Sequence, residues 1–176
     1  MEIGKHVFLH RGTKIFTHDW ASWCFIYSHN EFIPSHGKII LGNNIWLGEN
    51  VTILKGVTIG DNVIIGLGSI VTKSIPSNSV AVGAPAKVVC SYGEYLEKRR
   101  QEYVDEAKEY AQAIIKSGRK PTAADFYDDY PVFVDGTNCE KYNYPYSNIF
   151  SPEQFGRWKA THNAPFHGFE DFLNNL

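Results

Sequence analysis

The chain has 176 residues, with 17 Lys and Arg against 19 Asp and Glu, so its formal net charge at pH 7 is -2. This near balance gives no electrostatic case for binding nucleic acid. No apolar run approaches the roughly 18 residues of a membrane span, and the first residues lack the apolar stretch of a signal peptide. Cys24, Cys90 and Cys139 show no paired spacing, which is typical of a reducing cytosol. We therefore expect a cytoplasmic protein without a membrane span.

Residues 3–26 carry a weak repeat of six residues. Its aliphatic or small positions are Ile3, Leu9, Ile15 and Ala21. The turns between them are irregular, as the terminal repeats of solenoids often are. The repeat then breaks at residues 27–38, where Pro34 and Gly37 indicate a loop. Because an excursion from a regular solenoid often carries function, this loop is a candidate for the site.

From Leu41 to Pro76 the repeat of six is regular. Its first aliphatic positions are Leu41, Leu47, Ile53, Ile59, Ile65 and Val71. Short runs such as Val51–Ile53 alternate like strands, and the turns between them are rich in Gly, Asn and Asp, which tolerate positive φ. The pattern predicts a parallel β-solenoid of about four coils, over residues 3–20, 21–40, 41–58 and 59–76.

Beyond residue 90 the pattern changes to that of an α-rich extension. Residues 91–120 show helical spacing, and Gly118 is expected to end this helix. Three further elements are expected: a short strand at Pro131–Val134, a helix beginning at Ser151 and Pro152, and a helix over 169–176. The chain is thus divided into a solenoid domain, residues 1–90, and an extension, residues 91–176.

The extension is rich in aromatic residues: Phe126, Tyr127, Tyr130, Tyr142, Tyr144, Tyr146, Phe150, Phe155 and Trp158. Two accounts remain open. The rings either pack the extension onto its own or a neighbouring coil of the solenoid, or form a platform for sugars, with Asp128, Asp129 and Asn143 as polar partners.

Four segments carry a resemblance to a known family. They are GNNIWLG (42–48), GVTIGDN (56–62), GSIVTKSIP (68–76) and VGAPAKVV (82–89). Together they resemble the hexapeptide-repeat, left-handed β-helix acyltransferases, especially the galactoside and maltose O-acetyltransferases and their relatives that act on surface polysaccharides. The resemblance covers residues 1–90. It implies a mainly β fold with a left-handed coil, and a homotrimer with coenzyme A sites between subunits. It also implies acetyl-CoA-dependent O-acetylation of a sugar or surface-glycan hydroxyl.

His29 is the expected general base, because it lies in the loop excursion before the N-N-x-W segment, where the resembling enzymes carry their catalytic His. An acceptor hydroxyl must lose its proton as it attacks a thioester, and imidazole is suited to this at neutral pH. Asn30, Glu31 and His36, on the same loop, are the expected acceptor-binding residues.

The resemblance also assigns residues to the acyl donor, acetyl-CoA. Trp46 would lie near its acyl end, Gly48 would also contact it, and Gly66, Leu67 and Gly68 would lie along its pantetheine arm. Lys73 and Lys87 would bind its phosphates. No metal is expected.

Three alternatives remain. The enzyme could be a sugar N-acetyltransferase, which uses a related solenoid. It could be a γ-type carbonic anhydrase, whose zinc would need three of His6, His10, His18, His29 and His36. It could also be a glycan-binding solenoid without catalysis. His6, His10 and His18 are otherwise expected to be polar corner or surface residues.

Overall fold

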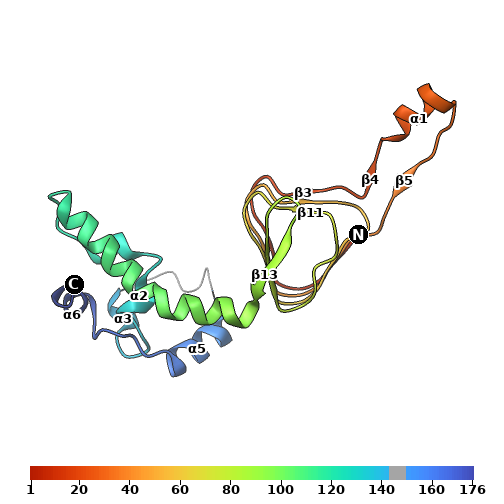
Figure 1. Cartoon of the computed structure of the whole chain (residues 1–176). Helices are drawn as coiled ribbons and strands as arrows, with labels where there is room; N and C mark the ends of the chain where they lie inside the picture. Colours follow the sequence, from red (N-terminus) through yellow and green to blue (C-terminus); the bar gives the residue numbers. More distant parts are fainter. Residues whose placement is uncertain (143–149) are drawn as a thin grey trace. The chain divides into compact units, whose positions relative to one another are not determined.

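The computed structural model describes residues 1–142 and 150–176. The chain forms two compact units, Met1–Lys98 and Arg99–Leu176. The boundary between them falls inside the long helix α2 (Tyr92–Lys116), shortly after the domain boundary expected at residue 90. Figure 1 shows the elements of both units.

The first unit is a parallel β-solenoid with three walls. The first wall contains β1 (Glu2–Ile3), β6 (Ile40–Leu41) and β9 (Thr58–Ile59). The second contains β2 (Val7–Leu9), β7 (Ile45–Leu47), β10 (Val63–Ile65) and β12 (Ser79–Val82), and β13 (Lys87–Ser91) adds an antiparallel strand to its edge. The third contains β3 (Lys14–Ile15), β8 (Thr52–Ile53) and β11 (Ile70–Val71). The expected mainly β solenoid is confirmed. The left-handed sense of its coil is inferred from the family resemblance.

The repeat of six places aliphatic side chains inside the solenoid. In β7, Ile45 and Leu47 are buried, whereas Trp46 between them is half-buried, because successive side chains of a strand point to opposite faces. Leu47 pairs with Ile65 of the next coil, and both are 0% exposed. Each aliphatic side chain buried in this way contributes about 1.5–3 kcal/mol to the stability of the fold.

Asparagines hold one corner of the solenoid. Asn44 Nδ2 donates to Asn62 Oδ1, and Asn62 Nδ2 donates to Asn78 Oδ1, both at 2.9 Å. These three residues have φ of 55°, 55° and 58°, a region that Asn enters more readily than most residues with a side chain. His6 has the same conformation, with φ of 56°, at this corner of the first coil. The Asn-rich turns therefore match the positive φ expected for them.

The bounds of the coils differ from those expected. Ile3 pairs with Leu41 and Ile15 with Ile53, so the first coil stacks directly on the coil that begins at residue 41. The separate coil expected over residues 21–40 is not formed, because Ala21 is the N-cap of a helix and not a wall residue. Three coils are followed by an incomplete one, in which Ile75 bridges to Ile59 and β12 pairs with β10.

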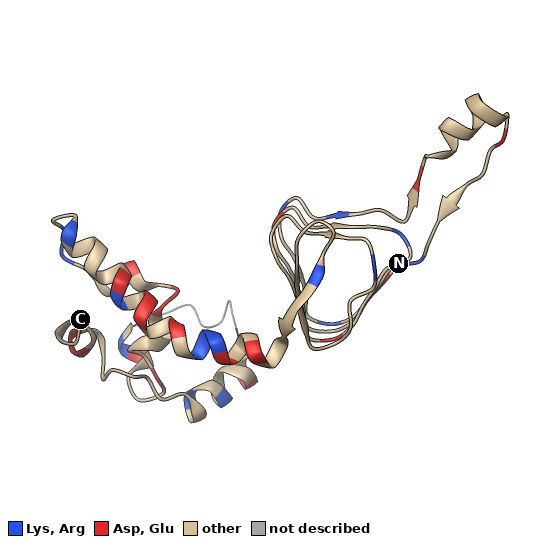
Figure 2. Ribbon diagram, viewed as in Figure 1, with Lys and Arg blue, Asp and Glu red and all other residues tan. Residues whose placement is uncertain are grey.

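Residues 18–36 instead leave the solenoid as an arm (Figure 1). β4 (His18–Asp19) and β5 (Ser35–His36) pair antiparallel at its base, and α1 (Ser22–His29) lies beyond them. The arm starts earlier than the loop expected at residues 27–38. It contains no Lys or Arg, as its mostly tan ribbon in Figure 2 shows. Where the arm rejoins the solenoid, a Cβ on Gly37 would lie 2.6 Å from the backbone nitrogen of Gly56, so glycine is needed there.

The second unit is helical in the residues described. Besides the greater part of α2, it contains η1 (Ala123–Phe126), η2 (Tyr130–Val132), α3 (Cys139–Tyr142), α5 (Pro152–Thr161) and α6 (Phe169–Asn174). The helix expected over 91–120 is present as α2, followed by Gly118 with φ of 83°. Ser151 caps α5 as expected, because its side chain accepts a bond from the N–H of Gln154. The strand expected at Pro131–Val134 is wrong, since the 3-10 helix η2 ends at Val132 and no strand follows it in this segment, although Val132 and Val134 are both buried.

An aromatic cluster forms the core of this unit. Phe126, Phe133 and Phe172 are fully buried, and the ring centroids of Phe126 and Phe172 are 5.3 Å apart. The helix α2 adds three smaller buried side chains: Ala107, Ala111 and Ile114. None of the described helices, in either unit, is long and apolar enough to cross a membrane.

Most of the aromatic residues described thus pack against one another within the helical unit, and packing onto a coil of the solenoid stays a prediction. Phe126 and Tyr130 are buried, and Phe155 and Trp158 stack at 5.8 Å between ring centroids. Tyr127 remains 47% exposed. Three residues of the two accounts lie outside the described part of the chain: Asn143, Tyr144 and Tyr146.

Candidate active site

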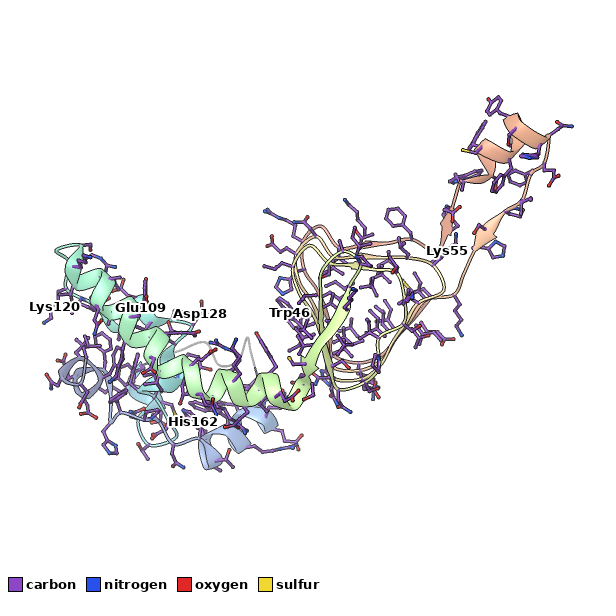
Figure 3. All side chains as sticks on the ribbon, in the orientation of Figure 1. Trp46, Lys55, Glu109, Lys120, Asp128 and His162 are labelled. Atoms are coloured by element: carbon purple, nitrogen blue, oxygen red, sulfur yellow. The ribbon has the colours of Figure 1, made fainter. Side chains whose placement is uncertain are left out.

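A pocket of about 610 Å³ opens where the arm leaves the solenoid. The start of the arm and the residues just before it contribute Phe16, His18, Asp19 and Trp20. The turns that follow the third wall in the next two coils contribute Leu54, Lys55 and Thr72. The backbone N–H of Phe16 donates to the carbonyl of Ile53 at 2.9 Å, which holds this end of the first coil against the next before the chain turns into the arm. Figure 3 shows Lys55 at the base of the arm.

A second, smaller pocket of about 100 Å³ lies within the base of the arm. It shares His18, Asp19 and Trp20 with the larger pocket, and its other lining residues come from the rest of the arm: Ser22, Phe32, Pro34, Ser35 and His36. Strand β4 and Trp20 thus line both pockets. We call the two pockets together the arm-base site.

The arm-base site combines an acid, a base and a cation between aromatic walls. The carboxylate of Asp19 is ion-paired with Lys55, and its Oδ1 accepts a bond from the N–H of Ala21 at 3.1 Å. His18 lies opposite His36 in the β4–β5 pair. The imidazole of His18 is nearly perpendicular to the indole of Trp20, at 81° with 6.3 Å between ring centroids. Such a pocket can bind hydroxyl groups and accept a proton from one of them.

The arm places His29, the expected base, elsewhere. His29 is the last residue of α1, is exposed, and lines neither pocket of the arm-base site. Its Nδ1 lies 2.6 Å from the hydroxyl oxygen of Ser28, and that hydroxyl donates to the carbonyl of Cys24 at 2.7 Å. Nδ1 then carries the hydrogen, and Nε2 is left to accept a proton. The partner that orients His29 is therefore Ser28, which the sequence analysis did not single out.

The expected acceptor-binding residues are divided between the two ends of the arm. Asn30 and Glu31 follow α1 and are exposed, whereas His36 lines the smaller pocket at the base. His18, which we expected to be a polar corner or surface residue, is the imidazole that lines both pockets. The repeat pattern did not single out His18, because Ala21 keeps the spacing of six beyond it.

The structure brings together four of the residues expected to bind coenzyme A. Gly48, Gly66, Leu67 and Gly68 lie at one corner of successive coils, where the N–H of Gly68 donates to the carbonyl of Glu49 at 2.8 Å. A Cβ on Gly48 would lie 2.8 Å from the nitrogen of Leu67, so stacking of the coils requires a glycine here whether or not a ligand binds. The side chain of Leu67 is 68% exposed, so this corner offers apolar surface beside accessible backbone.

The other three residues lie apart from this corner. Trp46 is on the second wall, two residues before Gly48, with its ring 5.1 Å from that of His10. Lys73 follows Thr72 of the arm-base site, and Lys87 begins β13; both are exposed. Within residues 1–142 and 150–176, no three His, Cys, Asp or Glu side chains gather as a group that could hold a metal ion.

Known proteins resemble part of this chain. Residues 38–73 match the family described as bacterial transferase hexapeptide (six repeats). Protein CapG of Staphylococcus aureus is 42% identical over 98 residues, which are 56% of this chain and 56% of CapG. The galactoside O-acetyltransferase of Escherichia coli strain K12 is 61% identical over 51 residues, 29% of this chain and 25% of that protein. The chain thus spans about half or less of the length of these curated relatives.

Solved structures resemble about half of the chain. A maltose O-acetyltransferase from Clostridium difficile 630 is 41% identical, with 48% of this chain and 44% of that one covered and a TM-score of 0.42. A galactoside acetyltransferase in complex with coenzyme A is 39% identical, with 51% and 44% covered and a TM-score of 0.44. The sequence comparisons confirm the resemblance to hexapeptide-repeat acyltransferases, and residues 38–73 carry the bacterial transferase hexapeptide repeat.

Proposed function

We propose that the chain transfers an acetyl group from acetyl-CoA to a hydroxyl of a sugar or a surface glycan. The observation that carries this proposal is the arm-base site, where His18, Asp19 and Lys55 lie together at the edge of a hexapeptide-repeat solenoid. The similarity of part of the chain to the galactoside O-acetyltransferase of Escherichia coli also supports it. The type of acceptor, the donor and the location in the cytoplasm all belong to the proposal.

The transfer needs one base and no covalent intermediate on the enzyme. The base takes the proton of the acceptor hydroxyl while its oxygen attacks the thioester carbonyl of acetyl-CoA. The carbon–sulfur bond then breaks, and the thiolate of coenzyme A leaves and takes up a proton. A backbone N–H near the carbonyl would stabilise the oxyanion that forms between these two events.

We weigh two imidazoles as this base, the one expected from the resemblance and the one that lines both pockets, and their positions separate them. His18 lines the arm-base site within its own chain, so it can reach an acceptor bound there. His29, the base expected from the resemblance, lies at the far end of the arm. It would act where the arm of one subunit reaches the site of another. We favour His18, because the pocket, the carboxylate and the ammonium are all beside it.

Single replacements test this assignment. His18→Ala is expected to lower the rate of acetyl transfer by about 10²–10⁴, the usual effect of losing a general base, with binding of acetyl-CoA unchanged. Transfer is measured by mass spectrometry of sugars incubated with labelled acetyl-CoA, with amino sugars included to detect N-acetylation. A large loss in His29→Ala and none in His18→Ala would return the role to His29. Full activity of both variants would exclude both imidazoles.

We further propose that three chains assemble, with coenzyme A bound between neighbouring solenoids at the corner of Gly48 and Gly66–Gly68. Several large apolar side chains are exposed on the solenoid and support such an interface: Phe8 at 67%, Phe16 at 48%, Leu67 at 68% and Val82 at 41%. Light scattering should give about three times the 19.9 kDa of the chain. A monomer that turns over acetyl-CoA would contradict the shared site.

Stoichiometric zinc whose removal abolishes activity would favour a carbonic anhydrase instead.

A further inference from the structure

We propose that Trp20 is the platform on which the acceptor sugar stacks, and that it selects a neutral pyranoside. This inference rests on the proposed function, because it names the class of acceptor that the arm-base site takes. Trp20 lines both pockets of the site, yet it is 61% exposed. An indole that is open to solvent beside a pocket has an apolar face available for a ligand.

The orientation of His18 suits a sugar stacked on this indole. The two rings stand at 81° to one another, with 6.3 Å between their centroids. A pyranoside lying flat against Trp20 directs the hydroxyls at its rim outward, roughly parallel to the indole plane. The imidazole beside the indole can then meet one of these hydroxyls at the edge of the stacked ring. Trp20 would thereby determine which hydroxyl faces the base.

The ion pair of Asp19 and Lys55 supplies both kinds of hydrogen-bonding group for the remaining hydroxyls. The oxygens of Asp19 are engaged by Lys55 and by the N–H of Ala21, but each carboxylate oxygen can accept more than one bond. The ammonium of Lys55 has three donors, so the bond to Asp19 leaves others for a ligand. A sugar hydroxyl can donate to Asp19 and accept from Lys55.

The charge around the site favours a neutral ligand. Lys55 is already compensated by Asp19, and the arm itself carries Asp19 and Glu31 but no Lys or Arg (Figure 2). A strongly anionic sugar would therefore find no uncompensated cation among the residues that line the larger pocket. The volume of about 610 Å³ lies within the usual range for pockets that bind small molecules. We therefore assign the site to a neutral pyranoside with an apolar face of C–H groups.

The test compares two tryptophans with methyl β-D-galactopyranoside and maltose as acceptors. Trp20→Ala should raise the KM for the acceptor about ten- to hundredfold, with the KM for acetyl-CoA unchanged, because the stacking surface is lost. Trp20→Phe should recover part of the affinity. Trp23→Ala is the matched control, since Trp23 is 53% exposed on α1 but lines neither pocket, and it should leave both constants unchanged.

Binding measured without turnover separates this inference from the proposed function. Saturation-transfer NMR should show methyl β-D-galactopyranoside bound to the wild type and to Trp23→Ala, and weakened in Trp20→Ala. Galactitol has comparable hydroxyls but no ring face, and should bind far more weakly. If the pyranoside binds through Trp20 but is never acetylated, the proposed function fails and the platform stands. The platform is overturned if Trp20→Ala binds the sugar as well as the wild type, or if the wild type binds no pyranoside.

Discussion

The two units of this chain bury their cores in different ways. The solenoid repeats one aliphatic side chain at a fixed step, so that Leu47 meets Ile65 through the pairing of neighbouring coils. The helical unit brings together rings from separate segments, and Phe126, Phe133 and Phe172 follow no common spacing. The first core is set by a local rule that every coil repeats, whereas the second depends on contacts that form once. Only the first kind of core can be recognised from spacing in the sequence.

The largest expected effects come from removing one core side chain in each unit. Phe133 is fully buried, with its ring 5.2 Å from that of Phe169 between centroids, so Phe133→Ala should cost about 3–5 kcal/mol. Leu47→Ala should cost about 2–5 kcal/mol. Calorimetry should show two transitions, with each variant lowering one of them. Ile115→Ala, at a 51% exposed position of α2, is the control and should shift neither. If both core variants lowered a single common transition, the two units would unfold as one.

The solenoid could be predicted well where the repeat is regular and poorly where it is not. The spacing from Leu41 to Val71 placed the walls and the Asn-rich corners correctly. Ala21 keeps the same spacing but caps a helix, because a single small residue at step six does not require a wall. A separate coil over residues 21–40 was therefore expected, whereas the first coil stacks directly on the one from residue 41.

The site and the helical unit were harder to predict, because their contacts join residues that no regular spacing in the sequence relates. The motif order pointed to the arm but not to its fold, so His29 was assigned to the mouth of a loop and lies at the end of a helix. His18 became a candidate base because it lines a pocket together with Leu54 and Lys55, which are distant in sequence and lie near it only in the folded solenoid. The apolar run Pro131–Val134 resembles a strand locally, and packing against the aromatic cluster makes it a turn.

A corner of the solenoid should tolerate less change than its exposure suggests. Asn62 accepts a bond from Asn44, donates one to Asn78, and has φ of 55°. Asn62→Ala loses both bonds and keeps a strained backbone, which should cost about 2–3 kcal/mol. Asn62→Gly relieves the backbone and should cost about 1 kcal/mol less than Asn62→Ala. Chemical denaturation followed by circular dichroism measures the difference. Equal losses in both variants would show that the bonds alone matter at this corner.

The helical unit should respond to acid through Asp135. Bonds from the hydroxyl and the N–H of Thr137, at 2.6 and 2.8 Å, lower the pKa of the Asp135 carboxyl despite partial burial. Its contribution to stability is therefore complete above the ordinary carboxyl pKa of about 4 and is lost as the pH falls below that value. Burial raises the pKa of Asp129, so its contribution has the opposite sign and is lost as the pH rises through its folded pKa.

Calorimetry between pH 7 and pH 3 should show the transition of the helical unit moving down in acid. Asp135→Asn should reduce this acid-induced fall in the melting temperature by a few degrees at most, because only one carboxyl group is removed. Asp105→Asn, at an exposed position on α2 in the same unit, is the matched control and should leave it unchanged. An unaltered acid response in Asp135→Asn would show that other carboxyl groups dominate it.

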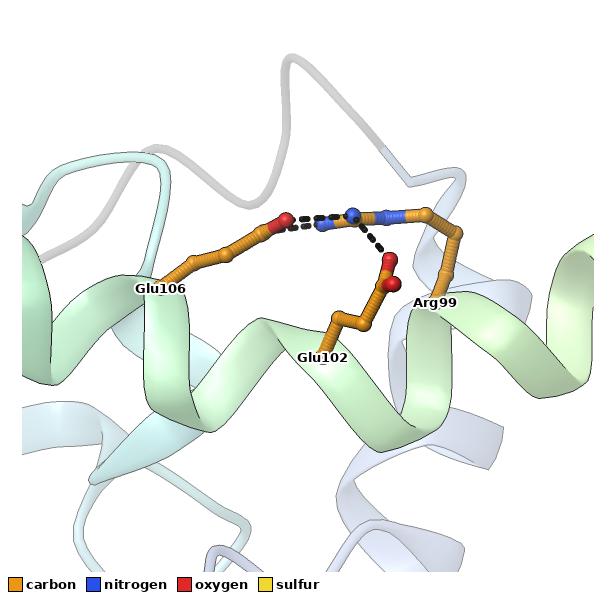
Figure 4. Close-up of polar contacts among 3 residues, drawn as sticks. All are labelled: Arg99, Glu102 and Glu106. Carbon is orange, nitrogen blue, oxygen red and sulfur yellow. Dashed lines mark hydrogen bonds and ion pairs between the residues drawn. The ribbon is translucent and has the colours of Figure 1, made fainter.

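The smallest effect is expected on the outer face of α2, where Arg99 bonds Glu102 and both carboxylate oxygens of Glu106 (Figure 4). The side chains of Arg99 and Glu106 are 38% and 52% exposed, so water and salt screen their attraction. Glu106→Gln should therefore cost less than about 1 kcal/mol, and this cost should vanish at high salt. Glu109→Gln changes the same charge on the same helix, at a residue labelled in Figure 3 that forms no ion pair among the described residues. Its effect should be smaller and independent of the ionic strength. A loss above 2 kcal/mol in Glu106→Gln that persists at high salt would show that this cluster is a structural element of the helical unit, comparable to the aromatic core, and not a solvated surface pair.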